Sequence, residues 1–182
     1  FGVQDLSEAL NVTDVAANQL PYSLLFRAIE DQVLPKCVES GVPVMAYSSL
    51  AQGLLTGKFT SPAEVDDERA RIRFYSKDRP GTVHNEEGYE DLVFETLDTI
   101  KSICTERNIS MSHAAVNWVL SKPGVLSVLV GARKPEQVED NIDCFNCTTD
   151  DELLKKLDEA TGALKEAMGP NPDMWRTESR FR

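Results

Sequence analysis

Residues 125–142 read VLSVLVGARKPEQVEDNI, and this stretch contains one complete unit of the fold. Its first six residues are a short apolar run, which is typical of a buried strand. The polar turn at 131–134 follows, and Pro135 then stands in the first turn of a helix, where proline is tolerated. Three apolar side chains of this helical segment are expected to be buried: Val138, Ile142 and Phe145. The stretch therefore predicts a strand, a loop and a helix in succession.

The same alternation extends along the rest of the chain. Two further apolar runs predict strands at residues 14–20 and 42–47. Apolar residues at helical spacing predict helices over 4–10, 29–40, 91–107 and about 110–121. Pro35 is expected to kink or restart the second of these helices. A last helix is expected after a capping box formed by Thr149 and Glu152.

Strands that alternate with helices favour an α/β fold with a parallel sheet covered on both faces. Three strands leave two open edges, and a complete (β/α)8 barrel needs about 250 residues. The 182 residues are therefore expected to form a single partial domain, the back part of such a barrel. A long polar loop at 59–90 and a tail at 167–182 complete it, and loops of that length are commonly lids, binding loops or disordered segments.

Charge and composition exclude several classes of partner. The chain has 19 Lys and Arg residues against 30 Asp and Glu residues, a net charge of −11. This balance argues against nucleic acid and against a polybasic membrane anchor. No apolar run approaches the roughly 20 residues that span a bilayer. We expect a soluble intracellular protein, in a plastid or the cytoplasm.

The four cysteines are too few for a disulfide scaffold, so a reducing compartment is expected. Cys144 and Cys147 form a C-x-x-C pair, but no second pair or nearby His completes a zinc site. We expect free thiols at a helix end and no metal site. His84 and His113 have no visible partner in the sequence and are expected to be structural or exposed.

In such folds ligands meet the carboxyl ends of the strands. The turn at 131–134 adds Arg133 and Lys134 to a helix start in an acidic chain, which suits a phosphate-bearing nucleotide. A solvated turn with two exposed cations is the alternative. Tyr47, at the end of another strand, could stack on a flat ring or plug the rim of the core. Lys58 follows a glycine-rich run that fails as a P-loop but could still meet a phosphate.

Four blocks of the sequence resemble the aldo-keto reductases, and more the plant and bacterial branches than the mammalian one. The blocks are NQLPYS (18–23), AYSSLAQGLLTGK (46–58), NWVLSKPG (117–124) and LVGARKPEQVEDNI (129–142). The end of the chain is similar to the tails of chloroplast-type members. The resemblance implies strands 6–8 of a (β/α)8 barrel, with their helices, a C-terminal helix and a tail.

The resemblance also implies NADP as the cofactor and a carbonyl as the substrate. Gln19 would hydrogen-bond the nicotinamide amide, and Tyr47 would stack on the nicotinamide. The loop along the pyrophosphate would contain Ser48, Leu50, Gln52 and Gly53. The adenosine and 2′-phosphate site would contain Gly131, Ala132, Arg133, Gln137 and Asn141, with Arg133 the main contact to the 2′-phosphate. The loop with Arg71 and Arg73 would fold over the cofactor.

No residue of this sequence matches the family's catalytic Asp, Tyr, Lys and His, so no catalytic residue is assigned. The resemblance implies the NADP(H)-binding portion of an oxidoreductase that reduces carbonyls to alcohols. A small carbonyl substrate is expected only if the other half is present, and a protein partner is expected to cover the open sheet edges. Two alternatives remain: a non-catalytic structural or cofactor-sensing subunit of a larger assembly, and a plain nucleotide-binding module.

Overall fold

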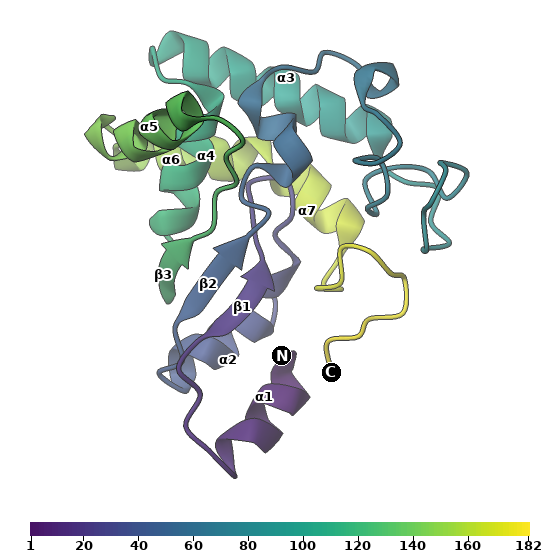
Figure 1. The fold of residues 1–182 in the computed structure, drawn as a ribbon, viewed down its shortest axis with the longest axis vertical. Coiled ribbons are helices and arrows are strands. Elements are labelled where there is room, and N and C mark those ends of the chain that lie inside the picture. Colours follow the sequence, from purple (N-terminus) through teal and green to yellow (C-terminus); the bar gives the residue numbers. More distant parts are fainter.

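A computed structural model describes residues 1–182. Three parallel strands form one sheet in the order β1-β2-β3 (Figure 1): β1 (Asn18–Pro21), β2 (Val44–Tyr47) and β3 (Val125–Val128). The connections between them contain the helices α2 (Val33–Glu39), α3 (Glu90–Glu106) and α4 (Met111–Leu120). The predicted α/β class and the parallel sheet are confirmed.

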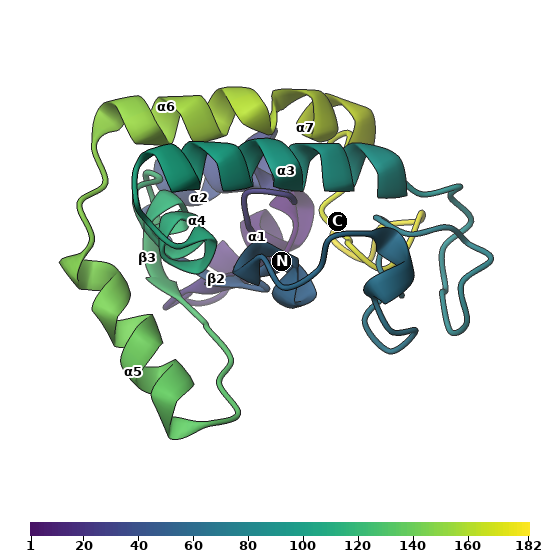
Figure 2. The same cartoon turned by 90° about the horizontal axis from the view of Figure 1, so that it is seen from above.

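The other helices precede and follow the sheet in sequence. They are α1 (Val3–Leu10), α5 (Pro135–Asp143), α6 (Asp151–Ala160) and α7 (Gly162–Met168). Four short 3-10 turns complete the elements: Ala28–Glu30, Ala51–Thr56, Pro62–Glu64 and Cys144–Asn146. Seen from above, α6 and α7 run alongside α3, and α5 projects away from these three helices while still contacting α4 (Figure 2). None of the helices has both the length and the apolar content needed to cross a membrane.

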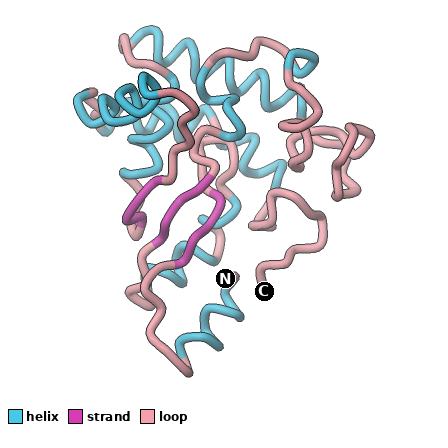
Figure 3. The backbone as a smooth tube through the Cα atoms, in the orientation of Figure 1, coloured by secondary structure: helices cyan, strands magenta, loops and turns pink.

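The two faces of the sheet differ. Leu20, Val44 and Ala46 are fully buried beneath the helical layer. On the opposite face Gln19 is exposed, and its register partner Met45 is only half-buried. The predicted coverage of both faces is therefore wrong for these residues, because all the packed helices lie on one side. In Figure 3 the three strands are seen from the other side, and no helix crosses in front of them.

Two element starts differ from the sequence prediction. β1 begins at Asn18 because its backbone amide is the first to pair with the segment beside it, donating to the carbonyl of Pro43, just before β2, at 2.9 Å. Residues 14–17 precede that pairing. The second predicted helix restarts at Val33 after a 3-10 turn. Pro35 then falls in the first turn of α2, where an amide hydrogen has no helical partner to lose.

The helix starts depend on side-chain caps. Ser110 caps α4 as predicted, its hydroxyl accepting from the His113 amide at 3.2 Å. The cap of α6 is Asp150, whose carboxylate accepts from the Leu153 amide at 2.8 Å. The predicted capping box at Thr149 is therefore wrong by one residue, because the carboxylate next to it takes the position.

β3 and α5 are much more exposed than their sequences predict. Leu126 of β3 is 66% exposed. The three side chains expected to be buried by the helix after it are also exposed: Val138 at 49%, Ile142 at 59% and Phe145 at 70%. They line an open apolar groove of about 430 Å³ between β3 and α5. The amphipathic pattern is present, but no element of this chain lies over it.

The segment 59–90 has only one short 3-10 turn and is nevertheless well packed. Phe74 and Tyr75 are buried in the core. Arg73 is also buried; it forms an ion pair with Glu86 and donates to the carbonyl oxygens of Met168, Asn171 and Asp173 at 3.0–3.2 Å. The guanidinium of Arg73 thus holds the C-terminal tail, and the expectation that its loop folds over a cofactor stays a prediction. Arg71 is exposed and donates to the Asp67 carbonyl.

Candidate functional site

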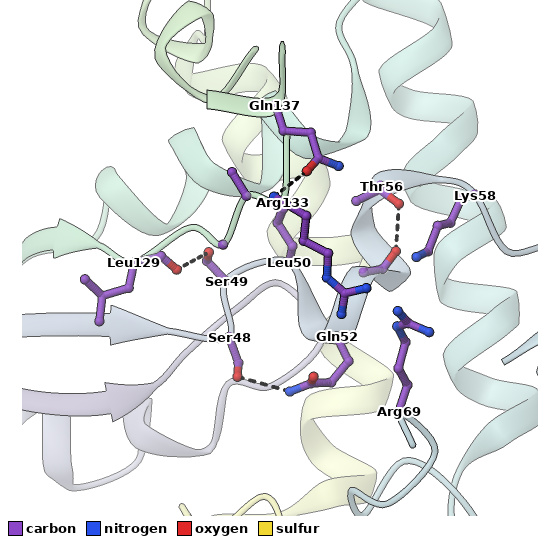
Figure 4. A pocket seen from close by; sticks show the side chains of 13 residues that line it. Ser48, Ser49, Leu50, Gln52, Thr56, Lys58, Arg69, Leu129, Arg133 and Gln137 are labelled. Carbon is purple, nitrogen blue, oxygen red and sulfur yellow. Dashed lines mark hydrogen bonds between the residues drawn. The ribbon is translucent and has the colours of Figure 1, made fainter. Parts of the chain in front are cut away.

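A cavity of about 570 Å³ lies at the carboxyl edge of the sheet, between the loops that follow β2 and β3 (Figure 4). The segment 56–69 and the start of α5 form its other sides. The lining residues are Ser48, Ser49, Leu50, Gln52, Gly53, Thr56, Lys58, Arg69, Leu129, Gly131, Ala132, Arg133 and Gln137. The cavity is therefore where the strand-end rule predicts a ligand.

The loop after β2 has an unusual backbone. Three residues other than glycine have left-handed φ angles: Ser48 at 55°, Ala51 at 47° and Gln52 at 58°. Such conformations are unfavourable for L-residues and concentrate at functional sites. Two contacts hold the loop: the Ser49 hydroxyl donates to the Leu129 carbonyl at 3.3 Å, and the Gln52 amide donates to the Ser48 hydroxyl at 3.4 Å.

Gly53 completes this loop, also with a positive φ, of 92°. A Cβ at this position would lie 3.3 Å from Cε and Nζ of Lys58. The absence of a side chain here therefore lets the Lys58 ammonium lie beside the loop. Thr56 supports the same turn by donating to the Gly53 carbonyl at 2.8 Å.

The loop after β3 leads directly into α5. The Arg133 amide donates to Oε1 of Gln137 at 2.7 Å, which ties the loop to the first turn of the helix. Lys134 is the N-cap and makes no side-chain capping bond. The first-turn amides therefore lack a side-chain acceptor, as at helix starts that bind anions. Gly131 faces open space on the cavity side of this loop.

Positive charge is concentrated in this cavity. Lys58, Arg69 and Arg133 line it, whereas no lining residue is acidic, in a chain of net charge −11. Arg69 forms an ion pair with Asp66, but Lys58 and Arg133 form none. Burial and the two neighbouring guanidinium groups lower the pKa of Lys58. Because like charges repel, this cluster favours an anionic ligand that would neutralise it.

The structure brings most of the predicted binding residues together. Those that line the cavity are Ser48, Leu50, Gln52, Gly53, Gly131, Ala132, Arg133 and Gln137. Gln19 and Tyr47 lie outside it, on the open face of the sheet; their register places both on the side of Met45. Asn141 also lies outside, on the apolar groove of α5.

Tyr47 lies beside the C-terminal tail. Burial and the nearby Asp173 carboxylate raise the pKa of its hydroxyl, against the effect of Arg180. Arg180 in turn pairs with Asp173 at 2.6 Å, and the Asp173 carboxylate is fully buried. Tyr47 is therefore held at the sheet edge between the cavity and the tail, with its ring partly packed on the core.

Arg69 is the main residue of the candidate site that the sequence analysis missed. It belongs to a segment without periodicity that also contains Arg71 and Arg73, and nothing in the sequence separates the three. Only the folded segment turns Arg69 towards the cavity (Figure 4) and Arg73 towards the tail. The lining contains no carboxylate, imidazole or thiol. The site can therefore bind and orient an anion, but it has no pair for acid–base chemistry.

Comparison with known proteins gives a consistent picture. The profile described as "Aldo/keto reductase family" matches residues 1–161. The NADH-specific methylglyoxal reductase of Escherichia coli is 29% identical over 158 residues, which are 85% of this chain and 45% of that protein. An L-glyceraldehyde 3-phosphate reductase of E. coli O157:H7 is 31% identical over 144 residues, 78% of this chain and 40% of that protein.

A probable voltage-gated potassium channel subunit beta of Arabidopsis thaliana is also similar, at 27% identity over 149 residues, 78% of this chain and 44% of that protein. Among solved structures, a glycerol dehydrogenase of Gluconobacter oxydans matches with a TM-score of 0.71 and 27% identity. The match covers 95% of this chain and 49% of that one. The chain thus spans about half the length of the relatives it matches.

Proposed function

The chain belongs to the aldo/keto reductase family of oxidoreductases, and from this premise we propose that its cationic cavity binds the phosphates of NADP(H). The observation that carries the proposal is the set of three cations, Lys58, Arg69 and Arg133, with no acidic residue in the same lining. A dinucleotide with a 2′-phosphate is the nicotinamide cofactor with the greatest negative charge. The site therefore fits NADP(H) by charge.

The shape of the site supports an extended ligand. The loop at 48–53 follows β2 directly, and Tyr47 precedes it on the same strand. A molecule that leaves the cavity along this loop meets Tyr47 and then Gln19 on the open sheet face. We propose that the adenosine phosphate lies at Arg133 and Gln137, and that the nicotinamide ring lies at Tyr47, with Gln19 hydrogen-bonding its amide.

When bound, NADP(H) would supply the hydride that reduces a carbonyl to an alcohol. The residues of this chain would bind and orient the cofactor. Tyr47 would present a ring face to it, and the lysine and arginines would neutralise its phosphates. We propose that the proton donor, and with it the whole carbonyl reductase activity, depends on residues outside positions 1–182.

We also propose that these residues form strands 6–8 of a (β/α)8 barrel. Two features support this: one sheet face carries no helix, and the groove between β3 and α5 is apolar and open. Polypeptide that contains the remaining barrel strands would pair with the free edges of β1 and β3 and cover Leu126 and Phe145. A small carbonyl substrate would then bind between the two parts.

The cofactor proposal is tested by measuring the affinity of the chain for adenosine 2′,5′-bisphosphate and for 5′-AMP by calorimetry. The bisphosphate is expected to bind more tightly. Arg133→Ala should weaken the bisphosphate by about 1.5–3 kcal/mol, the range for a charge-assisted hydrogen bond, and should change 5′-AMP little. Arg71→Ala removes an arginine outside the cavity and is the matched control.

Two results would contradict the proposal. Equal losses for both ligands would remove the 2′-phosphate role of Arg133. A preference for 5′-AMP would favour NAD(H), the choice that the name of the E. coli methylglyoxal reductase states for that protein. The same comparison with NADPH and NADH, made once the remaining barrel segment is supplied, extends the test to the complete site.

A further inference from the structure

Three side chains outside the cavity, those of Asp140, His113 and Cys147, are hydrogen-bonded in series on the side of α4 that faces α5. Nδ1 of His113, in the first turn of α4, lies 3.0 Å from Sγ of Cys147. Nε2 of the same ring lies 3.0 Å from Oδ1 of Asp140 on α5. The sequence analysis found no visible partner for His113 and expected free thiols in the C-x-x-C pair. The structure joins these two features, which are 34 positions apart.

The proton positions in this series follow from the chemistry of the two groups at its ends, the Asp140 carboxylate and the Cys147 thiol. An ionised carboxylate only accepts hydrogen bonds, so the contact with Asp140 places the ring proton on Nε2. Nδ1 of the neutral ring is then an acceptor directed at the Cys147 thiol. Asp140 thus orients the imidazole, and the imidazole can take the thiol proton, which is the arrangement that activates a nucleophile.

Cys147 is also the accessible cysteine. It is half-buried, whereas Cys37, Cys104 and Cys144 are buried. Burial raises the pKa of each of those three thiols, which disfavours their reactive thiolate forms. The thiol and the carboxylate bind opposite nitrogens of one ring, so the three groups cannot converge on a metal ion, and no metal-binding cluster is found. Proton transfer therefore fits the geometry and metal ligation does not.

We infer that Cys147, with His113 as its base and Asp140 orienting that base, is a thiol site that exchanges with small disulfides. The thiol proton passes to Nδ1 of His113, and the sulfur attacks one sulfur of the disulfide. The new bond joins Cys147 to that sulfur as the original S–S bond breaks, and the departing thiolate takes the proton from His113. Cys147 is oxidised to a mixed disulfide, and the departing half of the reagent is reduced to a thiol.

The surroundings define the class of disulfide. Asp140 is hydrogen-bonded to His113, and Asp143 lies about one turn further along α5. The Cys147 thiol also donates to the Asp143 backbone carbonyl, at 3.7 Å. These carboxylates repel an anionic reagent. Uncharged or cationic low-molecular-weight disulfides therefore fit this site.

The experiment measures the rate at which 2-hydroxyethyl disulfide, an uncharged probe, modifies Cys147 at pH 7, with mass spectrometry reporting each cysteine separately. Cys147 is expected to react at least tenfold faster than free glutathione under the same conditions and faster than the other three cysteines. His113→Gln should reduce the rate at least tenfold. Circular dichroism confirms that each variant is folded.

Asp140→Asn and Asp143→Asn form a matched pair, because each removes one negative charge from α5. Asp140→Asn is expected to slow the reaction several-fold, and Asp143→Asn, whose side chain contacts Asn146 instead, by less than twofold. A Cys147 rate equal to that of glutathione, or an unchanged rate in His113→Gln, overturns the inference. Equal effects of the two Asp substitutions would overturn the orienting role of Asp140.

Discussion

Trp118 and Phe145 are both aromatic side chains of apolar helical faces, one before β3 in the sequence and one after it, and they have opposite environments. Trp118 is fully buried; its ring lies 5.3 Å from that of Tyr22, with Arg27 at 5.0 Å and Lys122 at 4.1 Å from its centroid. Phe145 is 70% exposed. The same type of sequence pattern therefore describes a sealed region around Trp118 and an open region around Phe145.

The difference shows what an amphipathic pattern encodes. It specifies a surface that has to be covered, but it does not specify that the covering element belongs to the same chain. In the sealed region α4, α6 and the turn at 28–30 cover one another, and Arg27, Glu30 and Asp158 bridge them. In the open region the groove between β3 and α5 remains without a cover.

The largest test of this comparison replaces each aromatic residue by alanine. Trp118→Ala should lower the free energy of unfolding by about 3–5 kcal/mol, because it leaves a cavity and removes the cation–π contacts. Phe145→Ala should change it by less than about 0.5 kcal/mol, as for exposed positions. Urea titrations give both values, and similar losses for the two variants would show that the two regions are equally packed.

Acid should weaken the sealed region through Glu30. Burial alone would raise the pKa of this carboxyl, but hydrogen bonds from Arg27, Lys165 and Tyr22 outweigh it and hold the pKa at about 2. Because the folded pKa lies below the usual glutamate pKa of 4.5, the stabilisation is complete above pH 4.5. It is lost as the pH falls towards 2, by roughly 3 kcal/mol in total.

Unfolding free energies measured between pH 5 and pH 2 test this prediction. Glu30→Gln removes the titrating group, so its curve should be flatter by that amount even if the variant is less stable throughout. A Glu30→Gln curve as steep as that of the unchanged chain would assign the acid sensitivity to other carboxyls.

A smaller effect concerns the helix starts of the two regions. α6 in the sealed region is capped by Asp150, whereas α5 in the open region begins at Lys134 without a side-chain cap. Asp150→Ala should cost about 1 kcal/mol, and Lys134→Ala less than half of that. Thr149→Ala, at the position that the sequence favours as the cap, should also cost less. Thermal or urea unfolding of the three variants decides the order.

The smallest effect on stability, with a clear effect on association, is expected for Phe145→Ser. If the groove is an uncovered interface, the chain at high concentration should self-associate through it or aggregate. Losing one central aromatic side chain should then weaken that association by about tenfold. Sedimentation velocity over a range of concentrations measures it. Cooperative unfolding of a strictly monomeric chain would contradict an open interface.

Much of the fold could be predicted from the sequence, because local chemistry determines it. The three apolar runs, the Ser110 cap and Pro135 at the start of α5 are signals within a few residues, and the structure has each element near its predicted place. The exposure of β3 and α5 could not be predicted, because burial depends on what else is present. The loop at 48–53 follows β2 at the carboxyl edge of the sheet, as predicted, but its left-handed residues, such as Ala51, carry no sequence signal.

The residues of the candidate site also fall into those that the sequence predicts and those that it does not. Arg133 and Gln137 could be predicted because a strand end, a turn and a helix start occur within a few residues. Arg69 could not, because its place depends on the path of an irregular segment. The contact between His113 and Cys147 joins positions that no local motif connects.

The buried side chain of Arg73 joins two parts of the protein that are far apart in the sequence. Its guanidinium fastens the segment that carries Lys58 and Arg69 to the backbone of residues 168–173. That backbone leads to the Asp173–Arg180 pair beside Tyr47. The two ends of the proposed NADP(H) site are therefore linked through one buried side chain, and we expect that a ligand that orders Lys58 and Arg69 would also stiffen the tail beside Tyr47.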